Sequence, residues 1–452
     1  MIQNFIGNPA KLTQKPATHT VCRNYGYITL FEHEREIIDT PSFQKLRRIK
    51  QLPSAHYIYP GATHTRFSHS LGVMHISGLF VKHLLEPYMN NLSEAEFLHY
   101  FFLVRLWGLT HDLGHGPFSH TFDKVVLEEM GLNHEYMSSK IVKEDKDIAR
   151  IIDEKLKEYD ISPEILSEYL GKSREEWGGA KTIGSTKHSE AAFYYILKGF
   201  YSTDIIDYLL RDNLYTGAGY GNFDWQRLIL SSHLVKNEIA LEIKARDTLD
   251  AFLLSRLFSF KTIYYHRWSR VVDYIIKNLL TKAKEKIDFG RYVDNVNEYR
   301  QLDEQSIFHL PELKDVPERK MLLNRVIPFR QIDQIVIPAP PRELSFLKED
   351  DLCRLLSDKM KGKLPDEAYF VDTPNLPLNP MIGEEEVLII DRSTSPHKAW
   401  HESIRKTSWG EIPSLIWTIR LYLHVDYDAI KEDVRQNFRT AIEGESQSRT
   451  HF

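Results

Sequence analysis

An apolar run that ends in a histidine–aspartate pair constrains this 452-residue chain more than any other feature. The most apolar stretch is FFLVRLWGL, residues 101–109, and it leads into His111 and Asp112. A membrane span needs about 20 apolar residues. This run is shorter and is interrupted by Arg105. We therefore expect a helix over 94–113 that is buried in the core and carries two polar, metal-binding side-chain types at its end.

The cysteine count limits the kinds of metal site that are open to the chain. Only Cys22 and Cys353 are present, which excludes a disulfide-rich scaffold and a cysteine-based zinc cluster and fits a reducing cytosol. Imidazole and carboxylate ligands suit Fe, Mn, Co, Ni or Zn better than Ca. We expect one divalent transition metal held by histidine and aspartate.

Charge and the N-terminal segment bear on partners and location. Lys plus Arg is 58 and Asp plus Glu is 63, which gives a net charge of −5. This balance argues against a protein whose main task is to coat nucleic acid, and it leaves room for a local basic pocket. Residues 1–15 contain no apolar signal segment. We expect a cytoplasmic protein without a membrane span.

The pattern along the chain changes once. A strand or small hairpin is predicted over 20–31, around Gly26, and mainly helical segments follow to about 280. After about 325, prolines cluster and short β-like runs appear, namely QIVIP, EVLII and WTIRLYLHV. We therefore expect a helical region over 1–325 and a separate C-terminal α+β lobe over 326–452. The helices are predicted over 41–51, 66–86, 94–113, 204–212 and 246–287.

Other polar residues accompany the histidine–aspartate pair. Arg66 and His69 are three residues apart, which places a guanidinium beside a metal-ligand type, as a phosphate site requires. His115 follows His111 by four residues, so a continuing helix would present both on one face. Two glycines next to His115 allow a tight turn.

A second polar stripe lies on the predicted helix over 204–212. Asp204, Tyr208 and Asp212 recur at every fourth residue inside an apolar segment, and such groups are costly to bury without partners. In the plain structural interpretation, Asp204 caps this helix and Asp207 pairs with Arg211 on the surface. We adopt that interpretation for Asp207.

Three blocks, GATHTRFSHSLGV, HDLGHGPFSHTFD and DIIDYLLRD, occur in this order. Together they resemble the HD-domain metal-dependent phosphohydrolases, and among these the deoxynucleoside triphosphate (dNTP) triphosphohydrolases. The resemblance implies a mainly α fold. An HD-domain helical core over about 45–290 would lie within the catalytic region 1–325, after a short N-terminal β-element. The implied reaction is the hydrolysis of a dNTP to a deoxynucleoside and tripolyphosphate.

The resemblance also assigns roles to individual residues. It implies that the metal ligands are His69, His111, Asp112 and Asp204. It implies that the acid–base residues beside the scissile phosphate are His115, His134, His120 and Asp123. It implies a substrate-binding set of Arg66 on the phosphates, Gln51 and Leu52 at the sugar and base, Tyr208 and Asp212 at the deoxyribose, and Arg256, Tyr264 and His266 on the late helix. Mg²⁺ is expected on the triphosphate.

Regulation and assembly follow from the same resemblance. Asp39, Gln44 and Arg47 match residues of an activating-nucleotide site, whereas the run Cys22–Gly26 departs from the family pattern there. Phe260 stands where the family has a further phosphate-contacting histidine. The resemblance implies a homodimer or homotetramer.

Two alternatives to a dNTP triphosphohydrolase stay open. One is a related HD phosphohydrolase acting on a monophosphate, cyclic or signalling nucleotide. The other is a nucleotide-responsive or nucleic-acid-binding regulator with secondary catalysis.

Overall fold

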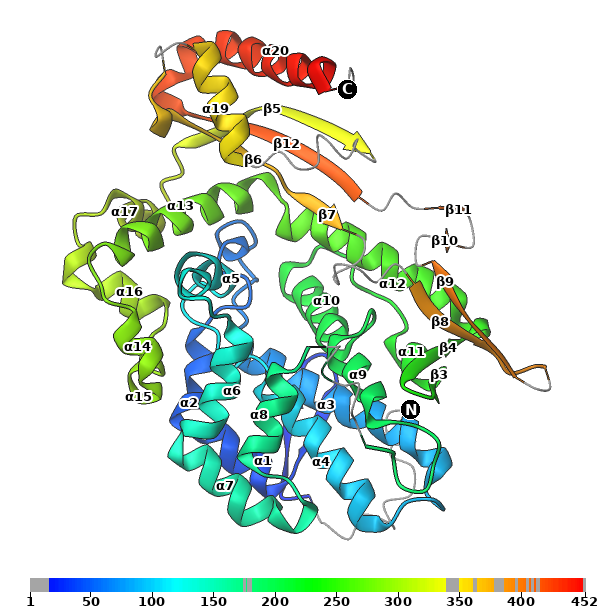
Figure 1. Cartoon of the computed structure of the whole chain (residues 1–452). Coiled ribbons are helices and arrows are strands. Elements are labelled where there is room, and N and C mark those ends of the chain that lie inside the picture. Colours follow the sequence, from blue (N-terminus) through cyan, green and yellow to red (C-terminus); the bar gives the residue numbers. More distant parts are fainter. Residues whose placement is uncertain are drawn as a thin grey trace.

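The computed structural model describes residues 16–173, 176, 181–338, 349–360, 364–377, 386–394, 397–403, 406–407, 410–411 and 415–449. The fold class is as predicted: a mainly helical region follows an N-terminal β-hairpin and carries a C-terminal α+β lobe (Figure 1). The expectation for residues 1–15 lies outside the described residues. In the described part of the chain, no helix is long and apolar enough to cross a membrane.

The N-terminal hairpin is the element predicted around Gly26. Strands β1 (Thr18–Cys22) and β2 (Gly26–Leu30) pair antiparallel. Gly26 has φ of +75°, a left-handed conformation that glycine adopts without the steric penalty of a Cβ atom. Helix α1 (Glu32–Ile38) follows at once, so the hairpin leads directly into the helical region.

Two long helices form the centre of the molecule. Helix α3 (Arg66–Leu85) packs along α4 (Glu94–Thr110), and both are buried on most sides, which accounts for apolar residues all round them (Figure 1). Ser93 caps the N-terminus of α4 and forms a capping box with Glu96. The helix ends at Thr110, three residues before the predicted end.

The early end of α4 follows from close packing against α6 (His134–Glu144). A Cβ atom on Gly114 would lie 2.0 Å from the backbone oxygen of His134, so only glycine fits there. Ser138 of α6 accepts a hydrogen bond from the Gly114 N–H and donates one to the carbonyl of His111. The chain therefore turns sharply after His111 and stays against α6.

Two other predicted helices are broken. The segment 41–51 is a short helix α2 (Pro41–Gln44), which Thr40 caps, followed by a 3₁₀ turn, Lys45–Arg48. The stretch 246–287 is divided into α12 (Arg246–Ser259), a π-helical turn (Phe260–Tyr264) and α13 (Arg267–Lys284). His266 accepts a hydrogen bond from the N–H of Trp268 and so caps α13.

Shorter elements surround the central pair. The further helices of this region are α5 (His120–Phe122), a π-helical turn (Asp123–Leu127), α7 (Lys146–Leu156), α8 (Pro163–Gly171), α9 (Tyr194–Lys198), α10 (Thr203–Thr216), α11 (Trp225–Leu230), α14 (Gly290–Asp294), α15 (Val296–Tyr299), α16 (Glu304–His309) and α17 (Pro317–Asn324). Ser202 caps α10 and Asn133 caps α6, each through a side-chain oxygen of a type that is common at this position.

A buried ion pair ties α4 to α1. Arg105 donates from Nε and Nη2 to the Glu34 carboxylate at 2.6 and 2.8 Å, and both side chains are buried. Burial opposes ionisation, but Arg105 holds the pKa of Glu34 below its ordinary value. The pair therefore stabilises the fold above the ordinary carboxyl pKa, and this contribution is lost as the pH falls.

Replacement of Arg105 by alanine is expected to lower the free energy of unfolding by about 3–5 kcal/mol, because it leaves the Glu34 carboxylate buried and unpaired. Urea denaturation at neutral pH measures the loss. Arg150→Ala is the matched control, since Arg150 and Glu154 form an exposed pair on α7 at 2.8 Å. That control is expected to change stability by less than about 1 kcal/mol. Equal effects of the two substitutions would contradict the assignment.

The C-terminal lobe has its own small core. Strand β12 (Leu415–His424) lies between β5 (Phe329–Pro338) and β6 (Tyr369–Asp372), pairing antiparallel with both, and β7 (Asn375–Pro377) also pairs with β12. Helices α19 (Glu349–Met360) and α20 (Lys431–Arg449) cover this sheet (Figure 1). A second small pair is β10 (Lys406–Thr407) with β11 (Gly410–Glu411).

The lobe is fixed to helix α13. The guanidinium of Arg270 lies 2.6 Å from the carboxylate of Asp372, and Tyr274 stacks on Phe370 at 3.9 Å between ring centroids. Tyr422 donates a hydrogen bond to the carbonyl of Arg267. The C-terminal sheet therefore lies on the outer side of α13, away from α3 and α4.

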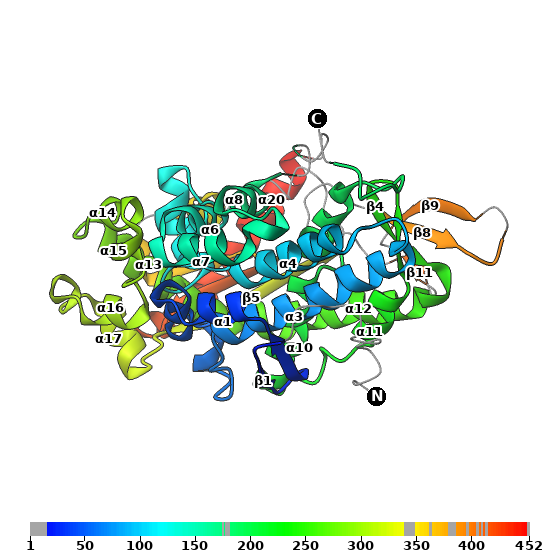
Figure 2. The same ribbon diagram turned by 90° about the horizontal axis from the view of Figure 1, so that it is seen from below.

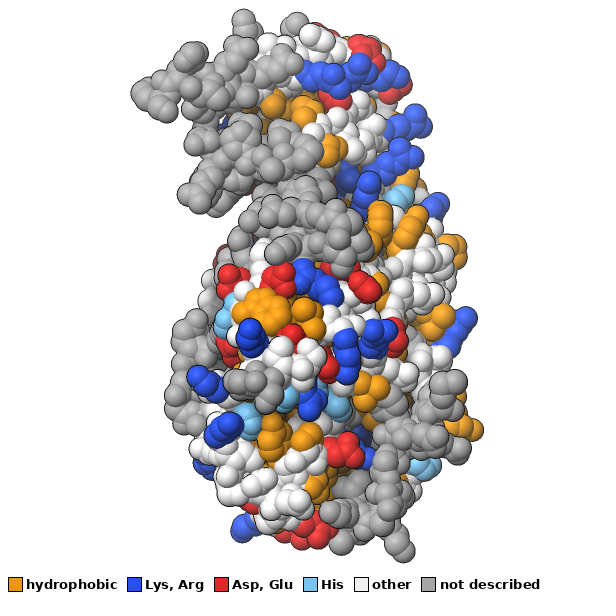
Figure 3. All heavy atoms as spheres, turned by 90° about the vertical axis from the view of Figure 1, so that its right-hand side faces the viewer, with side chains coloured by type: hydrophobic (Ala, Val, Ile, Leu, Met, Phe, Trp, Pro, Cys, Tyr) orange, Lys and Arg blue, Asp and Glu red, His pale blue; other side chains and the backbone are white. Residues whose placement is uncertain are grey.

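One sheet joins the two regions of the sequence. Strands β3 (Ser232–Val235) and β4 (Glu238–Glu242) form a hairpin, and β8 (Glu386–Asp391) adds to β4 in parallel. Strand β9 (Lys398–Ser403) completes the sheet beside β8. The β8–β9 hairpin extends from one end of the molecule (Figure 2). On the face in Figure 3, acidic and basic side chains are interspersed.

Candidate metal centre and active-site cavity

The four predicted metal ligands lie close together, although they come from three segments of the chain. His69 lies on α3, His111 and Asp112 follow the end of α4, and Asp204 lies in the first turn of α10. The Nε2 atom of His69 is 3.0 Å from Oδ1 of Asp204 and 3.7 Å from Oδ2 of Asp112. The Nε2 atom of His111 is 3.4 Å from Oδ1 of Asp112 and 3.7 Å from Oδ1 of Asp204.

The outer nitrogens of both imidazoles are held by the protein. Nδ1 of His69 is 2.7 Å from Oδ2 of Asp207, and Nδ1 of His111 is 2.8 Å from the carbonyl of Gly108. In the neutral imidazole, these bonds place the N–H on Nδ1 and the lone pair on Nε2, which is the tautomer that binds a metal. Both Nε2 atoms therefore face Asp112 and Asp204.

This group of atoms suits a cation. His111 Nε2 is buried and makes no hydrogen bond within the described part of the chain. Burial disfavours a charged imidazole, but hydrogen bonds to Asp204 and Asp207 raise the pKa of His69 to about 10. The carboxylates thus concentrate negative charge around His69, and the proton that this imidazole binds partly neutralises it. Two neutral imidazoles and two carboxylates are a donor set that fits a divalent transition metal.

The carboxylate of Asp207 corrects one sequence interpretation. Asp207 does pair with Arg211, at 2.8 Å, but the pair is fully buried and does not lie on the surface. Asp207 also accepts a hydrogen bond from the hydroxyl of Tyr25, at 2.7 Å. A Cβ atom on Gly72 of α3 would lie 1.9 Å from Asp207 Oδ1, so this glycine provides the space for the carboxylate. Periodicity alone did not reveal this partner of His69.

Asp207→Asn is expected to lower metal affinity about 10- to 100-fold, because the amide holds the Nδ1–H of His69 less strongly than the carboxylate does. Titration of the apoprotein with Mn²⁺ or Zn²⁺ measures the change without reference to turnover. Asp153→Asn, on the exposed face of α7, is the control. Unchanged affinity in Asp207→Asn would show that this carboxylate serves the Arg211 pair alone.

Arg66 connects the predicted metal ligands to a strained turn. It donates from Nη1 to Oδ2 of Asp112 at 2.6 Å and from Nε to the hydroxyl of Ser119 at 2.8 Å. Ser119 and its neighbour Phe118 have φ values of 53° and 64°, which are left-handed conformations in non-glycine residues. Each costs of the order of 1–3 kcal/mol and persists only where its surroundings hold it.

A second polar cluster lies beside the first. Asp123 Oδ2 is 2.7 Å from Nδ1 of His134, 3.4 Å from Nδ1 of His120 and 3.5 Å from Nδ1 of His115. The rings of His115 and His134 stack at 3.9 Å. Nε2 of His115 lies 3.4 Å from Oδ1 of Asp112, and this contact joins the two clusters. His115 arrives from the turn after α4, not from the helix itself.

The charges of this histidine cluster are set by its surroundings. Burial and the nearby Arg66 guanidinium hold the pKa of His115 well below its usual range, so this imidazole is neutral. Burial opposes ionisation of Asp123, but the neighbouring histidines hold the pKa of this carboxyl well below its ordinary value. The constant negative charge of Asp123 orients the imidazoles whose Nδ1 atoms face it, as acid–base chemistry requires.

Both clusters open onto one cavity. Its volume is about 160 Å³. Its walls include His111, Asp112 and Asp204 of the first cluster and His115, His120 and His134 of the second, whereas His69 and Asp123 are not among the lining residues. Of the predicted substrate-binding residues, Gln51, Arg66 and Tyr208 line it. The other residues around it are Trp107, Glu135, Leu170, Leu197 and Lys198. Lys198 and Glu135 form an ion pair at 2.9 Å at this cavity, and no local sequence pattern had marked either residue.

Two predicted substrate-binding residues, Asp212 and Tyr264, form a layer behind Tyr208. Tyr264 packs edge-on against Tyr208 at 6.0 Å and donates its hydroxyl to Oδ2 of Asp212 at 2.6 Å. The other oxygen of Asp212 is 2.7 Å from Nε2 of His64, a residue with no predicted role. Asp212 and Tyr264 do not line the cavity but support the side chain that does.

Three further predicted residues lie away from the cavity lining. Leu52 packs in a small apolar cluster with Ala55, Ala62 and Ile263. His266 caps α13. Arg256 is buried beside the ring of Phe260, and its Nε and Nη1 atoms have no hydrogen-bond partner in the described residues.

The predicted activator residues lie near one another on α1, α2 and the following turn. Gln44 donates to the carbonyl of Ile38 at 2.7 Å and accepts a hydrogen bond from Nε of Arg47 at 2.8 Å. The guanidinium of Arg47 lies over the ring of Phe67 at 3.5 Å, and Asp39 is exposed at the end of α1. None of the three lines the catalytic cavity.

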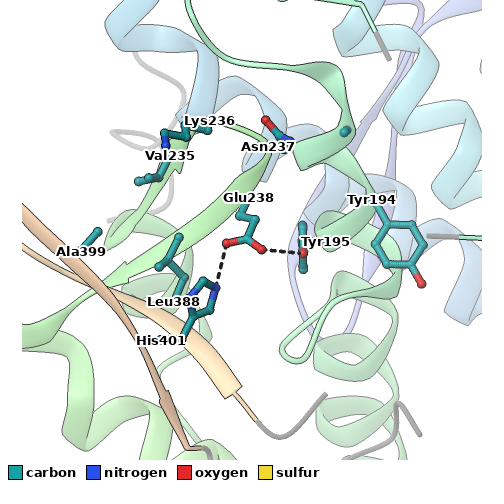
Figure 4. A pocket seen from close by; sticks show the side chains of 10 residues that line it. Tyr194, Tyr195, Val235, Lys236, Asn237, Glu238, Leu388, Ala399 and His401 are labelled. Atoms are coloured by element: carbon teal, nitrogen blue, oxygen red, sulfur yellow. Dashed lines mark hydrogen bonds and ion pairs between the residues drawn. The ribbon is translucent and has the colours of Figure 1, made fainter. Parts of the chain in front are cut away.

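A larger cavity, of about 470 Å³, lies between α9, the β3–β4 turn and the β8–β9 hairpin (Figure 4). Glu238 is 3.0 Å from Nε2 of His401 and accepts a hydrogen bond from the hydroxyl of Tyr195 at 3.4 Å. Its lining includes none of the metal-binding or histidine-cluster side chains of the described chain. The volume of a cavity therefore does not identify the one that contains the predicted catalytic residues.

Two family matches cover much of the helical region. Residues 66–190 match the HD domain, and residues 223–325 match the HD associated region. The first match contains both clusters apart from Asp204, and the second contains α12 to α17. HD domains bind divalent metals, in agreement with the donor set of the first cluster.

Curated relatives are similar over most of this chain. The chain is 29% identical to the uncharacterized protein YwfO of Bacillus subtilis, over 69% of each protein. It is 27% identical to the deoxynucleoside triphosphate triphosphohydrolase SAMHD1 of Gallus gallus and 28% identical to that of Homo sapiens, each over 78% of this chain. These matches span 62% and 61% of the two relatives.

A solved structure has the same fold. A hypothetical protein from Aquifex aeolicus superimposes with a TM-score of 0.69, over 93% of this chain and 99% of that one, at 22% identity. The match includes the C-terminal lobe, so helical region and lobe form an architecture that is shared beyond this chain.

Proposed function

We propose that this chain, which belongs to the HD-domain family, hydrolyses deoxynucleoside triphosphates to deoxynucleosides and tripolyphosphate. The observation that carries the proposal is one cavity in which a metal-type donor set meets Arg66 and Tyr208. The donor set provides a charge clamp for phosphate oxygens, and Tyr208 provides an aromatic wall for the sugar.

The metal would be held by His69, His111, Asp112 and Asp204, and when bound it supplies polarisation of a phosphoryl oxygen. Arg66 neutralises the charge that develops on the phosphoryl oxygens. It must release part of its hydrogen bonding to Asp112 when it engages the substrate. Asp123 accepts a hydrogen bond from Nδ1 of His134 and so orients this imidazole, which passes a proton to the leaving triphosphate as water attacks the α-phosphorus.

Selection of a deoxyribose is proposed to rest on the layer behind the cavity. Tyr208 is braced by Tyr264, which is itself tied to Asp212. A braced ring beside the sugar C2′ excludes a hydroxyl by contact. Each oxygen of Asp212 retains a lone pair for the sugar 3′-hydroxyl. We propose that Gln51, Leu52, Arg256 and His266 complete the nucleotide site as the substrate orders their surroundings.

Assembly and regulation are part of the same proposal. We propose that the Asp39, Gln44 and Arg47 group binds an activating nucleotide and that the protein acts as a homo-oligomer in the cytoplasm. Arg47 offers a guanidinium for phosphate, and its bond to Gln44 sets the orientation of both.

Product analysis tests the function. The purified protein is incubated with Mn²⁺ and each of the four dNTPs, singly and in pairs, with ribonucleotides as the matched control. Tripolyphosphate and deoxynucleoside in equal amounts are the expected products, together with slower turnover of ribonucleotides. Release of orthophosphate alone would contradict the proposal. Turnover of a nucleoside monophosphate or cyclic nucleotide in place of the dNTPs would favour the related phosphohydrolase.

A further inference from the structure

A buried glutamate from the HD associated region holds two segments of the active site together. Glu304 is the first residue of α16, and its side chain is almost fully buried. Its Oε1 atom accepts a hydrogen bond from the N–H of Lys50 at 3.0 Å and one from the N–H of Phe118 at 3.4 Å. Lys50 and Phe118 are separated by more than sixty residues in the chain, so one carboxylate oxygen fixes their spacing.

Both segments lead directly to cavity residues. Lys50 precedes Gln51, and Phe118 lies two residues before His120; both Gln51 and His120 line the cavity. Ser119 donates its hydroxyl to the carbonyl of Lys50 at 2.9 Å and accepts from Nε of Arg66 at 2.8 Å. The carboxylate and the hydroxyl therefore bridge the same two segments.

The turn at Phe118 and Ser119 has a strained backbone conformation that needs support from the residues around it. Phe118 and Ser119 are consecutive residues with positive φ, and such conformations persist only where the surroundings determine them. Glu304 accepts a hydrogen bond from the N–H of Phe118. Phe308 of the same helix packs edge-on against the ring of Phe118, with 5.6 Å between the ring centroids. Helix α16 is thus the support on which the strained turn rests.

We infer that Glu304 is a positioning residue: it fixes the Phe118–Ser119 turn and, through Ser119, the guanidinium of Arg66 that grips Asp112 and the substrate phosphates. The inference rests on the proposed function for the role of Arg66, while the support of the turn stands on the contacts alone. The HD associated region thereby takes part in the construction of the site, although none of its residues is a metal ligand.

The charge of Glu304 provides a way to distinguish a positioning role of this side chain from a role in packing alone. Burial raises the pKa of Glu304 to about 7, against hydrogen bonds from Lys50 and Phe118. The other charged or titratable groups around it are the side chains of Lys50, Lys45, Arg48, Asp303 and Tyr57. A raised pKa means that ionisation costs stability as the pH rises above the ordinary carboxyl value. Glu304→Gln is therefore expected not to lower the Tm at pH 8.

Activity of three variants tests the inference. Glu304→Ala is expected to lower kcat about 10- to 100-fold, as a displaced phosphate clamp does, without loss of metal. Glu304→Gln resembles the protonated wild type, because a neutral oxygen is about half as strong an acceptor. It is expected to be about 3- to 10-fold slower than wild type at pH 8 and equal to it at pH 6. Glu318→Ala, at a buried glutamate of α17 paired with Lys282, is the matched control and is expected to keep wild-type kcat.

A double-mutant cycle and hydrogen exchange complete the test. In Arg66→Ala, addition of Glu304→Ala is expected to cause little further loss, since the glutamate acts through the arginine. Amide exchange in the peptide over 116–123 is expected to be faster in Glu304→Ala than in wild type, whatever the substrate is. Additive effects, a constant ratio of Glu304→Gln to wild type at all pH values, or unchanged exchange would overturn the inference. Faster exchange in a protein that turns over no dNTP would instead contradict the proposed function.

Discussion

An Asp204→Ala variant is expected to lose its bound metal and its hydrolytic activity together. Asp204 contributes one of two carboxylates that face the Nε2 atoms of His69 and His111. Its removal leaves three donors, and the stabilisation of phosphoryl charge that the metal supplies is worth several kcal/mol, or roughly a thousandfold or more in kcat. Metal analysis of the purified variant and initial rates with the preferred dNTP measure both losses.

Asp204 is a suitable position for this test, because its substitution is not expected to disturb the fold. Ser202 caps α10, and the Asp204 side chain is 37% exposed. Asp147→Ala is a matched control, since it removes an exposed carboxylate from the first turn of α7. Retention of metal by Asp204→Ala would remove this residue from the ligand set. Retention of metal with loss of turnover would assign it to substrate binding.

Asp123→Asn is expected to lower kcat about 10²- to 10⁴-fold while the protein keeps its metal. The substitution removes the charge that three imidazoles share: His134 at 2.7 Å, His120 at 3.4 Å and His115 at 3.5 Å. Without that charge, the imidazole that passes the proton to the leaving group is held less firmly in its orientation. The amide has nearly the same shape as the carboxylate, so the fold is expected to persist. Single-turnover rates and metal content are the measurements.

This second variant also decides between two candidate metal groups. His115, His120, Asp123 and His134 lie close enough to hold an ion, as do His69, His111 and Asp112. The group of His115, His120, Asp123 and His134 is expected to act in proton transfer, because Oδ2 of Asp123 already accepts a hydrogen bond from Nδ1 of His134. Loss of metal from Asp123→Asn with retention in Asp204→Ala would reverse the assignment. Glu128→Gln, on the exposed turn that follows Asp123, is the control.

Under the proposed function, the two clusters account for the binding of a polyanionic substrate by a chain with a net charge of −5. Three carboxylates, those of Asp112, Asp204 and Asp207, gather around His69 and His111, and a divalent metal reverses the local sign. Arg66 and Lys198 add positive charge to the same cavity wall. Net charge therefore describes the whole surface and not the site.

Local patterns in the sequence were informative where the signal was short-range. The N-terminal hairpin, the caps at Asn133 and Ser202 and the strands of the C-terminal lobe depend on residues within a few positions of one another. The fold class followed from them. Helix ends were less accurate, because α4 ends where Gly114 must approach the backbone of His134, a residue twenty positions later.

The supporting residues of the site were the ones that local patterns missed. Asp207 was interpreted as a surface partner of Arg211, since the i, i+4 spacing is the same for a buried and an exposed pair. Gly72, 135 residues earlier on another helix, is what gives it room beside His69. Glu304 and Lys198 carried no signal, because their partners are backbone groups and side chains of distant segments.

The sequence by itself determined the chemistry available to this protein: histidines and aspartates in the three blocks, an arginine beside them, and too few cysteines for another kind of metal site. Tertiary structure alone decided how those groups are used. Packing of α3, α4 and α10 brings together donors that lie up to 135 residues apart, and it fixes which imidazole nitrogen stays free. The physical reason is that metal binding and proton transfer depend on distances of a few tenths of an ångström. Such distances are set by long-range packing, which spacing along a chain does not encode.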